Sequence, residues 1–343
     1  MTPERFQELT SRYGLLGIAV VGDVCLDRYL EIDPERAEVS IETGLPVHNV
    51  VRVRAQPGGA GTVINNLAAL GVGAIIPITF LGDDGEGFEL RRGLAGVPGL
   101  VLDHVLTTSE RRTFTYCKPL VVAPGQAPVE LNRLDSKNWS PTPERVETQL
   151  IRSLHAVLPS VDAVVVLEQV DRLNTGVTTT QVLSALGELS ADRPVLPVLA
   201  DSRRGLRDWP RLSFKMNAAE LSALLGREDA VTLEEVTASA LELAKWNARP
   251  VFVTLAERGI VATSPDGRTE HVRSLPLRGP IDVVGAGDSV TANLATALAA
   301  GATIHEAITL AAIASSVVIH QLGTTGTASV PQLADLLPLA STP

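Results

Sequence analysis

Short apolar runs alternate along this chain with longer segments in which apolar side chains recur every three or four positions. The runs predict buried strands, and the periodic segments predict amphipathic helices. The predicted strands are residues 17–24, 75–81, 163–167, 195–200, 213–216, 251–255 and 260–262. The predicted helices are residues 61–70, 86–94, 143–158, 177–189, 218–225, 233–246, 286–300 and 304–321. This alternation indicates a layered α/β fold with a mostly parallel central sheet.

Two segments, residues 29–56 and 110–134, break this alternation. Each contains stretches in which apolar and polar residues alternate, a pattern typical of strands with one exposed face. They are either a pair of edge hairpins or a small β-lid over the ligand edge of the sheet. We expect one domain over residues 1–343 that includes both segments. Exposed lids of this kind could pair across a two-fold axis, which predicts a homodimer.

Charge and composition narrow the class of protein. The net charge of −10 over 343 residues argues against general nucleic-acid binding, because phosphate backbones require a basic surface. It leaves room for a small phosphorylated ligand in a local basic pocket. Cys25 and Cys117 provide neither a disulfide framework nor metal-ligand spacing. No apolar run has the length of a membrane span, and the charged N-terminus has no signal-peptide core, so we expect a cytoplasmic protein without a membrane partner.

The turn "DVVGAGDS" at residues 282–289 carries the clearest candidate chemistry. Gly285, Ala286 and Gly287 precede a predicted helix, whose first N–H groups are unpaired and attract anions. Asp288 follows on the first turn. It could simply complement the helix dipole. In phosphoryl transfer, however, an aspartate accepts the proton of the attacking hydroxyl while N–H groups hold the phosphate.

Other nucleotide-binding motifs are missing. The sequence contains no P-loop and no protein-kinase motif set, and Ile64 stands where a dinucleotide-binding fingerprint requires glycine. An NAD-dependent dehydrogenase is therefore disfavoured.

The order of the motifs is more specific than any one of them. The motifs are "VVGDVCLDRYL" (20–30), "PGGAGTVINNLAALG" (57–71), "FLGDDGEG" (80–87), "NAAELSALLG" (217–226), "VTLAERG" (253–259) and "DVVGAGDS". With them the sequence resembles the ribokinase-like (PfkB) carbohydrate kinase family over nearly its whole length. "GDVCLDRY", "PGG" and "ELNRLD" (130–135) are most similar to the bacterial heptose 7-phosphate kinases.

This resemblance implies a ribokinase-like three-layer fold with a β-lid, and transfer of the γ-phosphate of ATP, with Mg²⁺, to a hydroxyl of a sugar or sugar phosphate. Asp288 would be the catalytic base, and the backbone of residues 285–288 would form the anion hole. The residues implied on the nucleotide side are Asn217, Glu220, Thr254, Gly259, Asp282 and Gly323. Among them, Glu220 would place Mg²⁺ through water, and Asp282 would lie near a monovalent cation such as K⁺.

On the sugar side, the resemblance implies contacts from Asp27, Gly58 and Gly59. Thr62 occupies the position where the family usually carries the Asn of a G-G-x-x-N arrangement, and Asn66 lies further on. Both are candidate sugar contacts, as is Asp23. For Asp23 and Asp27 the alternative role is turn chemistry.

These motifs leave the identity of the phosphoryl acceptor open. Arg203 and Arg204 of "ADSRRG" could bind a phosphate or form a solvated basic turn. A nucleoside or vitamin alcohol is an alternative acceptor on the same fold. A non-catalytic descendant that only binds a sugar or nucleotide is a second alternative.

Overall fold

The computed structural model describes residues 1–228, 230 and 232–340. Its centre is a nine-stranded sheet in which the strands from β7 to β14 run parallel and β15 and β16 form an antiparallel edge. In spatial order the strands are β16 (Thr269–Val272), β15 (Ile260–Thr263), β14 (Val251–Thr254), β13 (Ser213–Asn217), β12 (Val198–Ser202), β11 (Ala163–Glu168), β1 (Gly17–Gly22), β6 (Ala74–Gly82) and β7 (Val105–Thr108).

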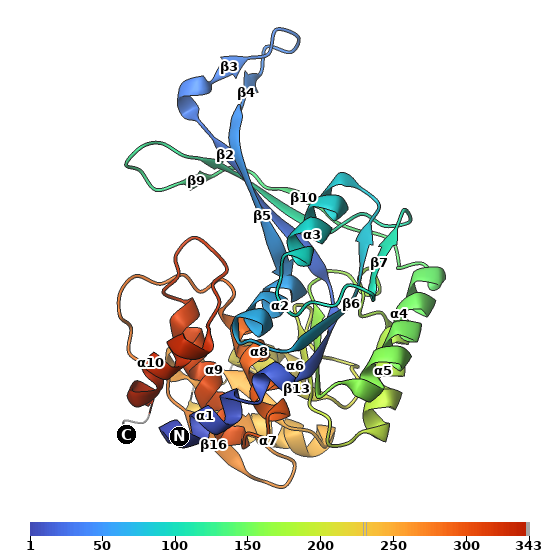
Figure 1. Ribbon diagram of the computed structural model, residues 1–343, viewed down its shortest axis with the longest axis vertical. Coiled ribbons are helices and arrows are strands. Elements are labelled where there is room, and N and C mark those ends of the chain that lie inside the picture. Colours follow the sequence, from blue (N-terminus) through green and yellow to red (C-terminus); the bar gives the residue numbers. More distant parts are fainter. Residues whose placement is uncertain (229, 231, 341–343) are drawn as a thin grey trace.

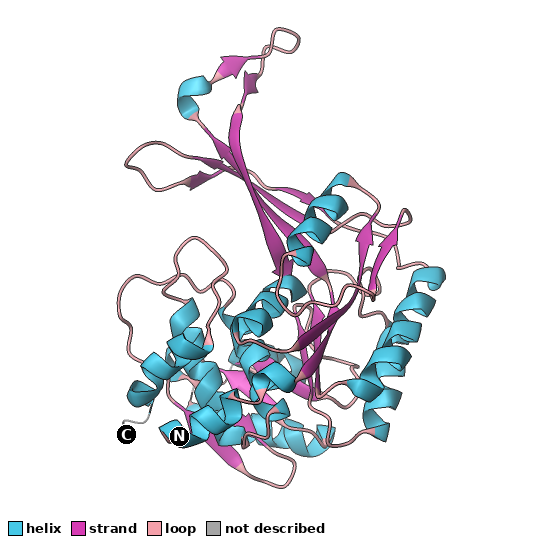
Figure 2. Cartoon of the chain, viewed as in Figure 1, coloured by secondary structure: helices cyan, strands magenta, loops and turns pink. Residues whose placement is uncertain are grey.

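Helices cover both faces of this sheet (Figure 2). On one side lie α1 (Pro3–Thr10), α2 (Ala60–Ala69), α8 (Ala286–Ala299), α9 (Ile304–Val318) and α10 (Val330–Ala340). On the other side lie α4 (Glu144–Val157), α5 (Thr180–Asp192), α6 (Ala218–Leu225) and α7 (Leu233–Asn247). Successive side chains of a strand point to opposite faces. Accordingly, Ile18 and Val20 of β1 enter the first core, whereas Ala19 and Val21 enter the second. The predicted α/β fold is confirmed.

A second sheet rises from the central one at the top of Figure 1. Its strands are β2 (Val24–Ile32), β5 (Val50–Gly59), β8 (Thr115–Val121), β9 (Val129–Glu130) and β10 (Leu134–Ser136). Beyond it, β3 (Glu38–Val39) pairs with β4 (Pro46–Val47), and α3 (Gly85–Ala95) contacts β2 and β5 at its base. The sheet is longer than the predicted segments 29–56 and 110–134, because it begins at residue 24 and reaches residue 136.

The boundary between the two sheets lies at Asp23, inside the strand predicted for residues 17–24. A side chain at Gly22 would place its Cβ 2.2 Å from the carbonyl oxygen of Leu167, so β1 lies tightly against β11 up to that residue. From Val24 onward the chain pairs instead with β5 and β8. An apolar run records burial but not which sheet a strand joins, and one predicted strand is therefore two.

Other bounds also differ from the predictions. The strand predicted at 195–200 is Val198–Ser202, and the strands β7 and β16 and the helices α1 and α10 were not predicted. Among the described residues, no helix combines the length and apolar composition needed to cross a membrane.

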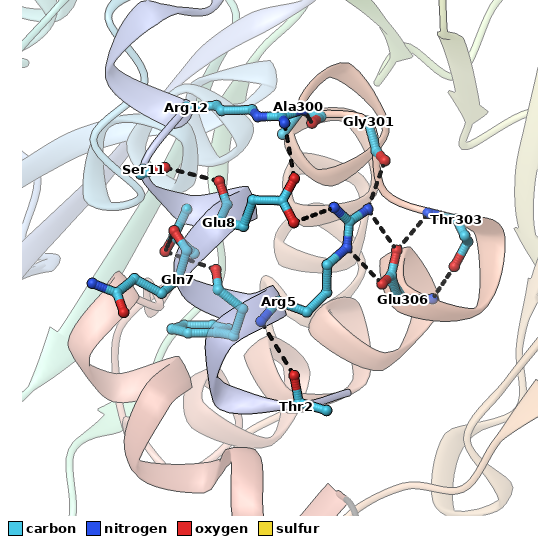
Figure 3. Close-up of polar contacts among 12 residues, drawn as sticks. Thr2, Arg5, Gln7, Glu8, Ser11, Arg12, Ala300, Gly301, Thr303 and Glu306 are labelled. Atoms are coloured by element: carbon cyan, nitrogen blue, oxygen red, sulfur yellow. Dashed lines mark hydrogen bonds and ion pairs between the residues drawn. The ribbon is translucent and has the colours of Figure 1, made fainter.

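The N-terminal helix α1 is clamped to the turn between α8 and α9 (Figure 3). Arg5 donates from Nε to Glu306 at 2.8 Å and from Nη2 to the carbonyl of Gly301 at 2.9 Å. Arg12 donates to the carbonyl of Ala300 at 2.9 Å. The clamp thus holds the C-terminal end of α8, the helix that carries Asp288 on its first turn.

Candidate active site

The candidate site begins at the N-terminus of α8. Gly285 precedes the helix in the left-handed conformation, with a φ of 82°, which glycine adopts without strain. At Gly287 an added Cβ would lie 3.0 Å from Nζ of Lys215, so a lysine side chain packs directly against the turn. The N–H of Ala286 is donated to the carbonyl of Val283 at 3.2 Å. The N–H groups of Gly287 and Asp288 have no backbone acceptor within the described chain. They are the donors that the turn can offer to an anion.

Asp288 lies on the first turn of α8 and is only partly exposed. Desolvation raises the pKa of its carboxyl to about 7, and the negative charges of Asp201 and Asp27 act in the same direction. The ammonium of Lys215 opposes them and lowers the pKa. A carboxyl with a pKa near neutrality can take up and release a proton at physiological pH, which is what a general base requires.

Lys215 belongs to β13 and is 7% exposed. Its Nζ donates to Oδ2 of Asp201, at the end of β12, over 2.7 Å. The hydroxyl of Thr291 on α8 reaches the same oxygen at 3.4 Å. Neither Lys215 nor Asp201 was predicted. The available signal was a single lysine inside the apolar run "SFKMN", because a charged group in a buried strand needs a partner.

Asp27 lies on β2, at the base of the second sheet, and is 8% exposed. A Cβ at Gly58 would lie 2.4 Å from its Oδ2, so only glycine fits beside the carboxylate there. Burial raises the pKa of Asp27, whereas the positive charges of Lys118 and Arg133 lower it. The predicted sugar-side pair of Asp27 and Gly58 is thus adjacent in space, with two cations nearby.

Aromatic rings hold these cations in place. Nζ of Lys118 lies 5.0 Å from the centre of the Tyr29 ring, and the guanidinium of Arg133 lies 4.9 Å from the centre of the Tyr116 ring. Arg54 also stacks over Tyr29, at 4.7 Å. The pairing of β2 with β5 and β8 puts Tyr29 opposite Arg54 and Lys118. Arg54 is paired with Glu31 at 2.6 Å and Arg133 with Asp135 at 3.0 Å, so Lys118 is the one of these three cations without an ion pair in the described chain.

Asp23 has a different environment. Its side chain is 1% exposed and accepts three backbone N–H bonds, from Gln169 at 2.8 Å, Val170 at 3.3 Å and Val177 at 2.7 Å. These bonds fold the loop that follows β11. The contacts are those of the alternative role, loop chemistry, and we do not carry Asp23 forward as a sugar contact. Gly59 lies beside it, since a Cβ there would be 2.7 Å from the Asp23 carbonyl oxygen.

The two candidates on α2 differ in what they face. Thr62 is buried, and its Cγ2 lies 3.5 Å from the Cβ position of Gly285, so it packs against the α8 turn. The side chain of Asn66 is fully buried and donates to the carbonyls of Thr62 at 3.0 Å and Gly326 at 3.4 Å. Those bonds tie α2 to the C-terminal loop. Asn66 thus has a structural role here, and we do not carry it forward as a sugar contact.

Asn217 and Glu220 form a reciprocal capping box at the start of α6. Oδ1 of Asn217 accepts the N–H of Glu220 at 2.9 Å, and Oε2 of Glu220 accepts the N–H of Asn217 at 2.8 Å. This arrangement explains the N-x-x-E spacing through helix capping alone. It also fixes the Glu220 carboxylate at the carboxyl end of β13, the strand that carries Lys215.

The Glu220 carboxylate fits a site in which a Mg²⁺ ion is held mainly by phosphate oxygens and water. In the described part of the chain, no group of three acidic, histidine or cysteine side chains converges on one point. Mg²⁺ typically binds one or two carboxylates and completes its shell with substrate phosphates and waters. Glu220 would hold it through water, and the ion would neutralise charge on the phosphates.

The remaining nucleotide-side candidates form two groups. Asp282 accepts N–H groups from Val284 at 3.0 Å and Gly323 at 3.3 Å, so the structure brings Asp282 and Gly323 together. Thr254, at the end of β14, donates to the carbonyl of Met216 at 3.4 Å. Gly259 has a structural reason to be glycine, because a Cβ there would lie 1.9 Å from the carbonyl oxygen of Val272.

The basic turn after β12 is neutralised within the chain. Arg204 pairs with the buried carboxylate of Glu168 at 3.1 Å, and Arg203 pairs with Asp171 at 3.2 Å. Of the two arginines, Arg203 is the more exposed.

The fold is that of a sugar kinase, and the site combines an aspartate on a glycine turn with a second carboxylate, Asp27, whose charge raises the pKa of the first. The chain belongs to the PfkB family of carbohydrate kinases, whose model, described as pfkB family carbohydrate kinase, matches residues 17–331. The predicted family is thereby confirmed.

Among curated proteins, the chain is similar to the bifunctional protein HldE of Hyphomonas neptunium, with 33% identity over 93% of this chain and 63% of that protein. Its likeness to the HldE of Azorhizobium caulinodans is 31% identity over 90% of this chain and 62% of that protein. The chain thus spans less than two thirds of the length of these relatives.

Two solved structures share the fold. Arabidopsis thaliana ribokinase, complexed with ribose and ATP, matches with a TM-score of 0.64 and 20% identity over 96% of this chain and 99% of that one. Escherichia coli phosphofructokinase-2, in complex with fructose-6-phosphate, matches with a TM-score of 0.68 and 20% identity over 95% and 99%.

Proposed function

We propose that this protein transfers the γ-phosphoryl group of ATP to a hydroxyl of a sugar phosphate, with Asp288 as the general base. The observation that carries this proposal is the state of Asp288. Its carboxylate makes no hydrogen bond within the described residues, has a pKa of about 7, and lies where α8 offers two free N–H groups. A carboxylate left without donors beside an anion-binding turn is suited to accept a proton.

The chemistry follows from this arrangement. The acceptor hydroxyl oxygen forms a bond to the γ-phosphorus and gives its proton to the Asp288 carboxylate. The bond from the γ-phosphorus to the bridging oxygen breaks, and its electron pair leaves with ADP. The N–H groups of Gly287 and Asp288 stabilise charge on the phosphoryl oxygens, as an oxyanion hole does. Asp27 binds sugar hydroxyls and orients the one that reacts.

The ammonium of Lys118 on the second sheet supports a phosphorylated acceptor. Lys118 and Arg133 act electrostatically on Asp27, the candidate sugar contact. Arg133 is paired with Asp135 at 3.0 Å, whereas Lys118 has no ion-pair partner within the described chain and is available to bind the phosphate of a sugar phosphate. The resemblance to heptose 7-phosphate kinases and the likeness to HldE proteins make a heptose phosphate the first acceptor to test.

The experiment is a panel of acceptors with ATP and Mg²⁺, including neutral sugars, hexose and heptose phosphates, nucleosides and vitamin alcohols. Wild type is compared with Asp288→Asn, which removes the base, and with Asp335→Asn, an exposed aspartate on α10. We expect turnover of a sugar phosphate, a loss of about 10²–10⁴-fold in kcat for Asp288→Asn, and no change for Asp335→Asn. Full activity in Asp288→Asn would overturn the assignment of the base.

The panel also separates the alternatives. Turnover of a nucleoside or vitamin alcohol would establish kinase chemistry with a different acceptor. Ligand-induced thermal stabilisation without turnover of any acceptor would favour a non-catalytic descendant.

We also propose that the second sheet acts as a lid and as a homodimer interface. Many apolar side chains are exposed on this sheet and on the β3–β4 hairpin beyond it. On the sheet they are Val50, Val51, Val53, Val129 and Leu134, and on the hairpin they are Val39, Ile41 and Leu45. Exposed apolar strands are suited to pairing with a second copy. Light scattering at micromolar concentration is expected to give the mass of a dimer, and replacing Val51 and Val53 with lysine is expected to give a monomer. A wild-type monomer would contradict this proposal.

A monovalent cation beside Asp282 is a further part of the proposal. The Asp282 carboxylate is partly exposed and joins the α8 turn to the loop at Gly323, so a bound cation would order both nucleotide-side loops. We expect the activity of wild type to rise when K⁺ replaces a bulky organic cation in the assay. The activity of Asp282→Ala should not respond to this exchange of cations.

A further inference from the structure

Lys215 occupies a position that should be apolar. In β13 the side chains of Phe214 and Met216 enter the core on the α7 side. Alternation along the strand directs Lys215 to the opposite face, which is covered by α8. Burying an ammonium costs several kcal/mol unless charge and hydrogen bonding compensate for the lost water. A lysine at 7% exposure in a central strand therefore calls for a specific reason.

Asp201 accounts for only part of that reason. An ammonium carries three donors. Within the described chain Lys215 makes one hydrogen bond, to Oδ2 of Asp201 at 2.7 Å. The same carboxylate oxygen receives the hydroxyl of Thr291, which fixes its position from α8. The pair holds the ammonium in place and leaves donors for another group.

The direction of the ammonium is set by the α8 turn. Nζ lies 3.0 Å from the point where a Cβ on Gly287 would stand, so the ammonium occupies the space beside the turn that has free N–H groups. Asp201, Asp288 and Glu220 all raise the pKa of Lys215, so the ammonium stays charged despite its burial. Lys215 is also the one cation whose charge lowers the pKa of Asp288.

We propose that Lys215 is a catalytic residue whose ammonium contacts the phosphoryl group in transit, and that Asp201 is the residue that positions it. The inference rests on the proposed function and adds a residue to it. When the γ-phosphorus passes from the bridging oxygen of ATP to the acceptor oxygen, its equatorial oxygens carry negative charge. Lys215 keeps its proton throughout and stabilises that charge, while the proton of the acceptor hydroxyl goes to Asp288.

The test removes the charge and keeps the fold. Lys215→Gln retains an N–H donor for Asp201, and Lys215→Met retains only the length of the side chain. Lys215→Arg restores a positive charge, and Lys245→Met, at an exposed position on α7, is the matched control. Melting temperatures identify which variants fold. If Lys215→Met melts well below wild type, the kinetic and binding measurements are compared between wild type and Lys215→Gln only.

Contact with the transferring group predicts an effect on kcat rather than KM. Loss of one preorganised donor to developing charge typically lowers kcat by about 10²–10³-fold. We expect this loss in Lys215→Gln, with KM for the acceptor within about threefold of wild type. Lys215→Arg should recover part of the rate, and Lys245→Met should match wild type.

Nucleotide affinity provides a readout that does not depend on turnover. Wild type should bind a non-hydrolysable ATP analogue more tightly than ADP, because only the analogue has the third phosphate that reaches Lys215. Isothermal calorimetry on Lys215→Gln should show this preference reduced by about tenfold, since a charge-assisted contact contributes about that factor. The affinity for ADP should be unchanged.

The outcomes separate this inference from the proposed function. If Asp288→Asn is inactive while folded Lys215→Gln keeps both its kcat and its preference for the analogue, the ion pair with Asp201 is purely structural and the inference is wrong. If wild type binds neither nucleotide and phosphorylates no acceptor, the proposed function itself is wrong.

Discussion

Asp23 and Asp288 are two carboxylates that occupy similar positions in the fold but differ in the hydrogen bonds that they accept. Each follows a glycine at the ligand edge of the central sheet, and in each case desolvation raises the pKa, to about 6 for Asp23 and about 7 for Asp288. Asp23 accepts three backbone N–H bonds from the loop after β11. Within the described chain Asp288 accepts none and faces other charged groups instead.

The difference shows how to distinguish a structural carboxylate from a chemical one. Burial alone makes both groups reluctant to ionise. Backbone donors commit the oxygens of Asp23 to holding a loop, whereas the oxygens of Asp288 remain available to a substrate proton. A raised pKa therefore identifies a candidate base only together with an inventory of its hydrogen bonds.

The sharpest test of this contrast is the same substitution at both positions. Asp23→Ala leaves three backbone N–H groups without an acceptor, two of them buried, and each buried group costs about 1–3 kcal/mol. Removing either carboxyl also removes the cost of its raised pKa, so the comparison is made between the two variants at one pH. We expect Asp23→Ala to be less stable than Asp288→Ala by about 3 kcal/mol or more in the free energy of unfolding, measured with denaturant. Asp288→Ala orphans no donor and should not destabilise the protein. Equal destabilisation by both variants would remove the distinction.

The stability gained on neutralising Asp288 should depend on pH. Because the folded pKa is about 7 and the unfolded value 3.8, ionisation favours the unfolded state. The cost is absent below the unfolded pKa and grows until the pH exceeds the folded pKa. Asp288→Asn should therefore stabilise the protein by about 2 kcal/mol at pH 8, after allowance for partial exposure. At pH 4 we expect no gain, and a constant gain at all pH values would contradict the raised pKa.

The rate should follow the same ionisation. A base must be deprotonated to act, so kcat/KM should rise about tenfold between pH 6 and pH 8 as Asp288 ionises around pH 7. Asp201, Asp27 and Lys215 are the charged groups that set this value. Since Lys215 lowers the pKa of Asp288, Lys215→Gln should move the rise to higher pH. A flat profile in wild type would exclude Asp288 as the titrating base.

The smallest expected effect comes from the clamp of α1 on the turn after α8. Arg5 holds the pKa of Glu306 down, to about 2. This contribution to stability is present above the unfolded pKa of Glu306 and is lost as the pH falls toward 2. Arg5→Ala should lower the melting temperature by a few degrees at pH 7, with little change in kcat, because this ion pair lies near the surface. A large loss of kcat would show that the clamp also positions Asp288.

Much of the fold could be predicted because short local patterns of apolar residues indicate the strands and helices that form each layer. Continuous apolar runs are typical of a covered sheet, and most predicted strands and helices lie within a few residues of the observed ones. The turn at Gly285–Asp288 was predictable because small residues, an acid and a helix follow one another directly. The switch of sheets at Asp23 was not, because it depends on a contact with Leu167, far along the chain.

The site was less predictable for the same reason. The partners of Asp23 lie 146 to 154 residues away, and no local pattern identifies them. Lys215 reaches Asp201 and the α8 turn only because β12 and β13 are neighbours and α8 covers them. The sequence shows one lysine in an apolar run but not which face of the sheet it occupies.

The order of the strands has a consequence for synthesis on the ribosome. β1 lies between β6 and β11, and β2 pairs in parallel with β8. Residues 17–32 emerge early, yet their neighbours in both sheets end only at residue 168. A nascent chain shorter than this presents an apolar strand edge with no partner, which favours aggregation. We therefore expect chains that stall before residue 163 to depend on chaperones far more than the finished protein does.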